Sequence, residues 1–279
     1  MFRRRLSWCA DEVRRLDHDR FLTALFAPPA RREALFALYA LNAEIARTRE
    51  SVSEPMLGHI RLQWWRDALG ELYRGEARRH PVLQALEAPV REGVLPRAAF
   101  DALIDAREID LDDAPPASLD ALEAYAAATA GELSALAMRL CGEAGACALG
   151  AARQVGTAWS LIGLMRAVAF HAQAQRLFLP EDLLRDFGID RRSLFELRPT
   201  ANLDHVVRSV VDRARTLLGD ARAARRQVPR RAHAPLLLAT LADAHLAALA
   251  RCGYDVFALP PAGRPRPLRL LWAHWRGRY

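Results

Sequence analysis

Apolar residues recur every three or four positions in the stretch from residue 34 to residue 67. This spacing is the period of an α-helix that buries one face. The first half of the stretch shows it at Leu35, Leu38, Leu41 and Ile45. Polar residues 51–54 interrupt the pattern, and Pro55 then suits the first turn of a second helix, where a backbone N–H is not needed. The stretch therefore predicts two consecutive helices that form a hairpin in the core of the protein.

The whole chain has the composition of a helical protein. Its 279 residues are 52% apolar, rich in alanine and leucine, and poor in the runs of valine, isoleucine and threonine that form strands. A chain of this length can bury a sizeable core. No internal repeat or low-complexity linker divides it, so we expect a single all-α domain over residues 1–279.

The charge pattern limits the class of partner. All 40 basic residues are arginine, and with 33 acidic residues they give a net charge of +7. This balance favours an anionic partner, such as a membrane surface or a phosphorylated ligand. Because acidic residues are interspersed among the arginines, we expect no nucleic acid partner.

Signals for the compartment favour a cytoplasmic protein. The four cysteines form no C-x-x-C pair and are expected to be free thiols. The longest apolar run, residues 234–250, contains Asp243 and His245 and is too short to span a bilayer. Residues 1–5 are basic, but no apolar signal core follows them. We expect a cytoplasmic location, with attachment to the inner face of the membrane.

Residues 8–25 predict a first helix, which Pro28 and Pro29 close. The run from residue 17 to residue 20 contains two aspartates, a histidine and an arginine, residue types found in metal and acid–base sites. Adjacent residues on a helix point in different directions. The run therefore predicts a solvated helix face.

Two segments resemble the squalene and phytoene synthases, the head-to-head prenyl synthases. Residues 36–41 resemble the start of the first substrate helix of these enzymes, and residues 160–180 have the frame of their second motif. The residues that match this frame without a gap are Leu161, Arg166, Ala172, Arg176, Leu179 and Pro180. The resemblance covers nearly the whole chain. It implies an isoprenoid synthase-like helical bundle around a central cavity.

The matching positions lack most of the acidic residues that hold Mg²⁺ in these enzymes. In the first motif the family's acids fall on Ala46, Arg47 and Glu50. In the second motif the two aspartates are replaced by Ala167 and His171. The asparagine and the glutamate of the second motif are replaced by Gly163 and Phe170. A lone carboxylate cannot assemble the Mg²⁺ cluster that neutralises a leaving diphosphate, so the resemblance implies a non-catalytic protein without a cofactor.

The amino-acid sequence of residues 41–46 and 51–54 is similar to that of one branch of the superfamily. This branch contains the mitochondrial assembly factor of respiratory complex I. This resemblance implies two kinds of partner: an isoprenoid or lipid held in the cavity, and subunits of complex I whose assembly the protein assists.

The resemblance also implies which residues face the ligand. They are Asn42, Ala46, Arg47, Glu50, Trp64, Tyr125, Gly163, Arg166, Ala167, His171 and Arg176. We expect the helices around Ala46 and Ala167 to face each other across the cavity. At the motif positions, acidic residues are replaced by neutral or basic ones, including a histidine that can be protonated. The cavity is therefore expected to bind an anionic head group without metal. The alternative is that the arginines pair with acids such as Glu44 and Glu50.

An acidic stripe supports a competing hypothesis. Its members, spaced four, three and four residues apart, are Asp101, Asp105, Glu108 and Asp112. This spacing places carboxylates on one helix face, where they could hold Mg²⁺ in an active prenyl diphosphate transferase. The alternative is an exposed stripe that Arg107 and other arginines balance. A third hypothesis is a helical interaction protein with no ligand.

The C-terminal segment is basic and aromatic, and we predict that Arg269, Trp272, Trp275 and Arg276 contact a membrane. Apolar residues at helical spacing would lie on one face; they are Leu268, Leu271, Trp272 and Trp275. Nearby arginines that could meet anionic lipid are Arg264, Arg266, Arg269, Arg276 and Arg278. The alternative is that the aromatic residues dock on the protein's own core.

Overall fold

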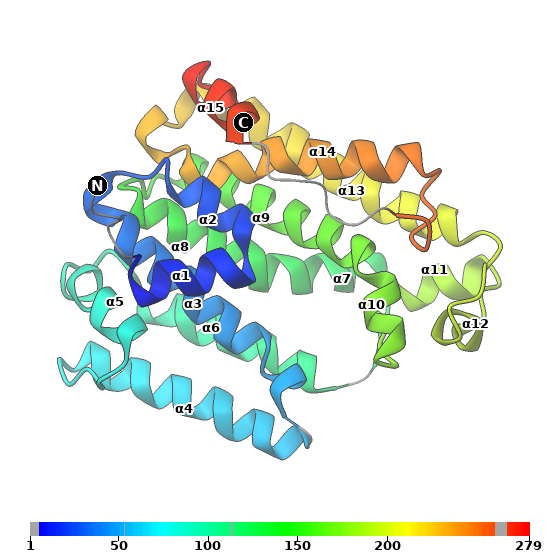
Figure 1. The fold of residues 1–279 in the computed structure, drawn as a ribbon, viewed down its shortest axis with the longest axis horizontal. Helices are drawn as coiled ribbons and strands as arrows, with labels where there is room; N and C mark the ends of the chain where they lie inside the picture. The colour runs from blue at the N-terminus through cyan, green and yellow to red at the C-terminus, as the bar shows by residue number, and fades with distance from the viewer. Residues whose placement is uncertain (1–5, 53, 113, 260–266) are drawn as a thin grey trace.

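The computed structural model describes residues 6–52, 54–112, 114–259 and 267–279, and these segments form helices joined by turns (Figure 1). No β-strand occurs within these segments. The all-α prediction is therefore confirmed. Residues 1–5 and the predicted membrane arginines Arg264 and Arg266 lie outside the described residues.

The chain begins with two short helices, α1 (Trp8–Leu16) and α2 (His18–Ala24), where the sequence predicted one. The break lies at Asp17, whose carboxylate accepts a hydrogen bond from the Arg20 N–H and caps α2. The same carboxylate pairs with the Arg20 guanidinium, and Arg20 is only 6% exposed. The predicted solvated face at residues 17–20 is thus wrong, because two of its members form a local cap and ion pair.

The two consecutive helices are present as predicted, but only the first lies in the core. Helix α3 (Arg32–Ala46) is followed by a single turn at Arg49–Ser51 and by α4 (Pro55–Tyr73). Eleven of the 15 residues of α3 are buried, since α3 packs against α1, α5 (Pro81–Arg91) and α8 (Glu132–Leu140). Helix α4 lies at one edge of the bundle and packs on α5 and α6 (Arg97–Glu108) (Figure 1).

Helix α9 (Ala146–Arg166) runs through the centre and packs against α13 (Leu203–Ala223), α8 and α14 (Leu238–Arg251). It also lies close to the π-helical turn Ala127–Gly131 that follows α7 (Leu119–Ala126). Gly156 permits this approach, because a Cβ at this position would lie 2.2 Å from the carbonyl oxygen of Ala130.

The predicted helix at residues 143–172 is interrupted at Ala167, which separates α9 from α10 (Val168–Gln173). The Ala167 N–H still bonds the carbonyls of Gly163 and Leu164, but its backbone leaves the helical conformation. Two short helices, α11 (Glu181–Asp186) and α12 (Arg191–Phe195), then lead to α13.

Helical residues 234–251 are long and apolar enough to cross a membrane, but 61% of this stretch is buried inside the fold, as in a core helix. The chain ends with α15 (Pro267–Trp275), which packs on α14. Leu270 and Ala273 of α15 are buried. The apolar residues that α15 leaves exposed are Leu268, Leu271, Trp272 and Trp275. The last helix is therefore docked on the core and also presents an apolar outer face.

Candidate functional site

A buried network of polar side chains lies where α6, α7 and the turn Ile109–Leu111 meet. The guanidinium of Arg107 donates to the Tyr125 hydroxyl oxygen at 2.9 Å and to the Asp110 carboxylate at 3.1 Å. The Tyr125 hydroxyl in turn donates to the other carboxylate oxygen of Asp110 at 2.6 Å. Each of the three side chains therefore contacts the other two.

The Arg107 network reaches both of the motif segments. On one side, the amide oxygen of Asn42 on α3 lies 3.5 Å from the Arg107 guanidinium. On the other side, Arg176, just beyond α10, donates to the backbone carbonyl of Asp110 at 2.8 Å. Chain segments that are far apart in sequence are thus joined through Arg107 and Asp110.

The electrostatics keep Arg107 charged and Tyr125 neutral. Burial lowers the pKa of Arg107, but Tyr125 and Asp110 more than offset this and raise it above its usual value. Burial also raises the pKa of Tyr125, against the effect of Arg107. A metal cation placed here would meet a fixed positive charge that has only one acidic neighbour in the network.

His171 lies next to this network and is uncharged at neutral pH. Burial, together with the nearby Arg176, lowers the pKa of His171 to about 4. Its ring packs edge-on against Phe178 at a centroid distance of 4.8 Å and against Phe170 at 5.4 Å. The positive charge expected at His171 is therefore wrong, because the histidine lies in an apolar and already cationic environment.

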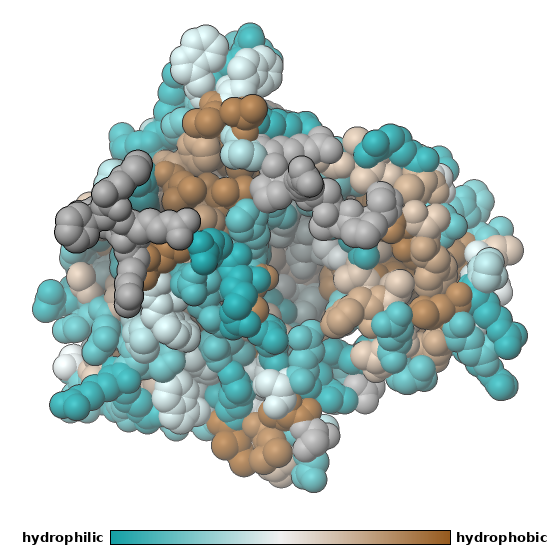
Figure 2. All heavy atoms as spheres, in the orientation of Figure 1, coloured by the Kyte–Doolittle hydropathy of each residue, from teal (hydrophilic) through white to brown (hydrophobic). Residues whose placement is uncertain are grey.

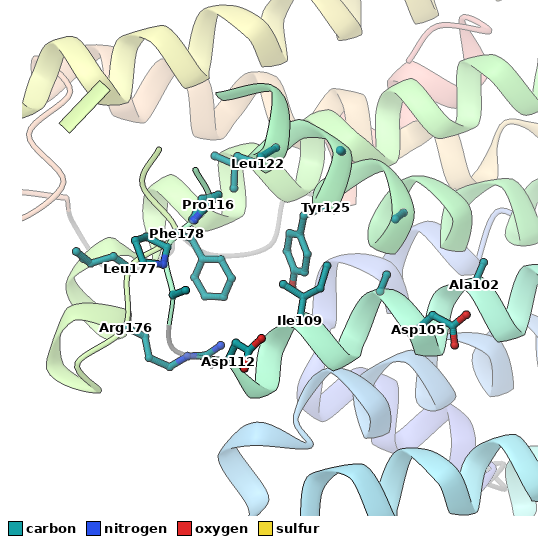
Figure 3. Close-up of a pocket in the computed structure, with 16 residues that line it drawn as sticks. Ala102, Asp105, Ile109, Asp112, Pro116, Leu122, Tyr125, Arg176, Leu177 and Phe178 are labelled. Atoms are coloured by element: carbon teal, nitrogen blue, oxygen red, sulfur yellow. The ribbon is translucent and has the colours of Figure 1, made fainter. Parts of the chain in front are cut away.

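A cavity of about 730 Å³ lies beside the network, between α6 and α7 (Figure 3). Its lining is mostly apolar: Ala102, Asp105, Ala106, Ile109, Asp112, Ala114, Pro115, Pro116, Ala121, Leu122, Ala124, Tyr125, Ala128, Arg176, Leu177 and Phe178. Figure 3 shows Tyr125 reaching from α7 towards α6, with Arg176 and Asp112 at one end of the cavity and Asp105 near the other. The cavity can accept an apolar chain with a polar group at the Arg176 end.

Two of the predicted ligand residues, Tyr125 and Arg176, line this cavity. The other nine lie outside its lining: Asn42, Ala46, Arg47, Glu50, Trp64, Gly163, Arg166, Ala167 and His171. For Asn42 on α3 the physical reason is that it contacts Arg107, whose partner Tyr125 lines the cavity in its place.

Several of these nine residues have other surroundings. Arg47 is exposed and lies 3.8 Å from Glu50, which is the predicted alternative of local ion pairing. Trp64 lies on α4 in a separate groove of about 550 Å³. A Cβ at Gly163 would meet no atom within 4 Å.

Arg166 faces α14 and α2. Its guanidinium lies 3.4 Å from the ring of His245, and that ring lies 3.8 Å from the Asp19 carboxylate. Burial lowers the pKa of Arg166, and Asp19 acts in the opposite direction. This partly buried cation belongs to a second polar cluster, apart from the cavity of Figure 3.

The acidic stripe is paired with arginines. Asp101 accepts from Arg97 at 2.8 Å. Asp105 and Glu108 both bind Arg66 of α4, and Asp112 lies beyond the end of α6. Within the described ranges, no three His, Cys, Asp or Glu side chains are grouped so that they could hold a metal ion. These residues therefore do not fit a Mg²⁺ cluster: Asp101, Asp105 and Glu108 share α6 as expected, whereas Asp112 lies after the helix has ended.

Sequence reasoning missed Asp110 as a site residue. Arg107 was recognised only as a charge that balances the acidic stripe. Its spacing of three residues from Asp110 is a usable signal for a pair on one helix face. Their burial, however, depends on Asn42, Tyr125 and Arg176, which lie far away in the sequence.

Comparisons with known proteins agree on one family. The model of the squalene/phytoene synthase family matches residues 13–276. The assembly factor 6 of NADH dehydrogenase (ubiquinone) complex I from Mus musculus is 30% identical over 274 residues, covering 98% of this chain and 82% of that protein. The presqualene diphosphate synthase of Rhodopseudomonas palustris is 29% identical over 205 residues, which is 73% of each chain.

The fold is similar to that of a solved squalene synthase from Alicyclobacillus acidocaldarius. The TM-score is 0.79 at 22% identity, and the match covers 88% of this chain and 93% of that one. At this level of identity the similarity concerns the fold, and it confirms the isoprenoid synthase-like bundle.

Proposed function

This chain belongs to the squalene/phytoene synthase family, and on that premise we propose that it is a pseudoenzyme that assists the assembly of respiratory complex I. The observation that carries the proposal is the Arg107 network. It sets the Arg107 guanidinium and Asp110 between Asn42 on the first motif helix and Arg176 of the second motif.

The chemistry of prenyl transfer explains why this observation matters. An allylic diphosphate ionises when Mg²⁺ ions on carboxylates neutralise the leaving group. Here the motif positions offer a single carboxylate, Glu50, which lies 3.8 Å from Arg47 on the surface. The network adds a fixed cation and no free carboxylate. These residues support neither a Mg²⁺ cluster nor the ionisation step.

The assembly role draws support from the relatives. The complex I assembly factor of Mus musculus is similar to almost the whole chain, whereas the presqualene diphosphate synthase is similar to about three quarters of it. Helix α4 offers a surface suited to a protein partner such as a complex I subunit, because exposed apolar patches mark interaction sites. Its exposed apolar residues are Met56, Leu57, Ile60 and Trp64.

The proposal includes a ligand and a location. The cavity of about 730 Å³ falls within the size range of small-molecule sites, roughly 300–1,000 Å³. Its apolar lining and the Arg176 guanidinium suit an isoprenoid or lipid with an anionic end. The exposed face of α15 suits peripheral attachment to the inner face of the cytoplasmic membrane.

Deleting the gene in its own organism tests the assembly role. The amount of assembled complex I, measured on native gels and as NADH oxidation by membranes, should fall and should return with the wild-type gene. Unchanged complex I in the deletion strain would contradict the proposal.

An assay for prenyl transfer tests the loss of catalysis. With farnesyl or geranylgeranyl diphosphate and Mg²⁺, the protein should release no more diphosphate than a protein-free control. If it forms squalene, phytoene or diphosphate, Asp105→Asn decides whether the acidic stripe is the metal site, since this variant would then abolish the activity.

A further inference from the structure

A smaller pocket, of about 300 Å³ and lined by polar side chains, lies where α13, α14 and α15 meet. Its lining residues are Arg222, Arg225, Thr240, Asp243, Arg269, Trp272, Ala273, Arg278 and Tyr279. Four of these side chains are guanidiniums, and one is a carboxylate. The pocket therefore concentrates positive charge on the part of the surface that α15 borders.

The single carboxylate is already shared by two arginines. Arg222 lies 2.9 Å from both oxygens of Asp243 and also donates to the main-chain oxygen of Tyr279 at 2.8 Å. Arg269 lies 3.7 Å from the same carboxylate. In the described part of the chain, Arg225 and Arg278 form no ion pair with an acidic side chain. Arg225 and Arg278 thus remain available to an anion.

Thr240 and His233 lie at or near this pocket. Thr240 lines the pocket and is 6% exposed. Burial lowers the pKa of the nearby His233, and His274, Arg230 and Arg225 lower it further, against its hydrogen bond to the Val228 carbonyl. The groups around the pocket therefore create a positive field at this end of the molecule.

The pocket continues into the exposed apolar face of α15. On a helix, Leu268, Leu271 and Trp275 lie opposite the buried Leu270 and Ala273. Leu268 is 78% exposed and Trp275 is 75% exposed. Trp272 is 54% exposed and also lines the pocket. Figure 2 shows a small apolar group over α15 near the top of the view, next to pale and hydrophilic residues.

We propose that this pocket binds the phosphate group of an anionic phospholipid while the apolar face of α15 enters the same membrane. Guanidinium forks match phosphate oxygens, and indole rings favour the boundary between head groups and acyl chains. The continuity of charge and apolar surface at Trp272 selects a lipid over a free phosphate ion. This inference rests on the membrane attachment proposed above and adds a specific head-group site to it.

Flotation of the full chain with two kinds of vesicle tests the inference. One kind is phosphatidylcholine alone, and the other contains one part phosphatidylglycerol in four. The double variant Arg225→Gln and Arg278→Gln should bind the anionic vesicles about 25-fold more weakly, because one arginine near an anionic surface contributes about 5-fold. Arg222 is left unchanged because it holds Tyr279 and Asp243.

A matched control carries the same loss of charge outside the pocket. Arg226 is exposed and adjacent to Arg225, and Arg185 is exposed on α11; neither lines the pocket. The double variant Arg226→Gln and Arg185→Gln should retain most of the binding. Equal loss in both double variants would assign the effect to diffuse charge and overturn the pocket, as would full binding by the pocket variant.

Two more arms separate the possible failures. The double variant Trp272→Ser and Trp275→Ser should bind neither kind of vesicle. If the wild-type chain also fails to bind both kinds of vesicle, the proposed membrane attachment is wrong, and this inference is wrong with it. Inorganic phosphate should not release the chain from anionic vesicles. Release by free phosphate would assign the pocket to a soluble anion and overturn the lipid site.

Discussion

The guanidinium of Arg107 lies inside the protein within reach of side chains from three other elements: Asn42, Asp110 and Tyr125. A buried ion pair adds little net stability, because its desolvation offsets the attraction between the charges. Removing one partner is different, since it leaves the other charge buried without compensation.

We therefore expect Arg107→Met to lower the free energy of unfolding by about 3–5 kcal/mol, measured by urea denaturation. Asp110 would keep only its hydrogen bonds from Tyr125 and, through its backbone carbonyl, from Arg176. Replacing both partners, with Arg107→Met and Asp110→Leu, should restore part of the loss. A single variant as stable as the wild type would contradict the proposed role of the network.

His171 gives a prediction for pH dependence. Its pKa is lowered from 6.5 to about 4 in the folded protein, so between these pH values the unfolded chain binds more protons than the folded one. The contribution of neutral His171 to the free energy of unfolding is fully present above pH 6.5. It declines as the pH falls towards 4, by at most about 1.4 kcal/mol per pH unit.

In His171→Phe, the free energy of unfolding should therefore decline less steeply between pH 6.5 and 4 than in the wild type. Part of the slope will remain, because burial also lowers the pKa values of His80, His233 and His274. His59→Phe, on the exposed side of α4, serves as the control substitution. Identical slopes for His171→Phe and the wild type would exclude His171 as the source.

At the residue scale, sequence reasoning found Tyr125 and Arg176, because the family resemblance implied both positions. It could not find Asp110, whose partners lie 15 and 66 residues away along the chain. It also assigned Arg47 to the ligand, whereas the residue is exposed beside Glu50. Local spacing predicts which residues share a helix face, but it does not predict which face another helix covers.

Among the helices, α9 offers a matched pair of glycines. A Cβ at Gly156 would lie 2.2 Å from the Ala130 carbonyl oxygen and 2.5 Å from the Ser134 hydroxyl, whereas a Cβ at Gly163 would meet nothing within 4 Å. Gly156→Ala should destabilise the protein by about 1–3 kcal/mol through overpacking. Gly163→Ala should stabilise it by about 0.5–1 kcal/mol through lost backbone entropy in the unfolded chain.

Thermal unfolding of both variants checks this prediction. If the two glycine variants shift the melting temperature in the same direction, then α9 and the π-helical turn do not approach as closely as described.

Helix α15 has a structural role as well as an exposed face. Deleting residues 267–279 removes the buried Leu270 and the hydrogen bond from the Tyr279 hydroxyl to the Ala221 carbonyl. We expect the truncated protein to melt at a lower temperature than the wild type. The doubly substituted Trp272→Ser and Trp275→Ser protein should melt close to the wild type, because both side chains are more than half exposed. A truncated protein of unchanged stability would show that α15 is not docked.

The existence of the helices could be predicted from apolar spacing, and their interruptions could not. The break at Asp17 arises because its side chain caps α2, which competes with one continuous helix. The break at Ala167 occurs at a residue that is neither Gly nor Pro, so the sequence does not predict it. The acidic stripe shows the same limit, since Asp101, Asp105 and Glu108 do share α6, but their partner Arg66 comes from α4 and Asp112 lies beyond the helix.

For the whole molecule, the arrangement predicts indifference to divalent metal. A ligand that binds only the folded state raises stability in proportion to the logarithm of its concentration. Since the acids of α6 are paired with Arg66 and Arg97, neither Mg²⁺ nor EDTA should change the melting temperature. A rise in melting temperature that grows with Mg²⁺ concentration would reveal a site that the paired acids do not explain.

The depth of α3 has a consequence for how the protein moves over time. Opening free energies differ across a structure, and deeply packed helices open only when the whole protein unfolds. With 11 of its 15 residues buried, α3 should hold its amide protons for as long as the fold survives, while the exposed ends of α4 and α15 exchange sooner. A protein built this way can take up and release partners at its edges many times while its centre stays closed.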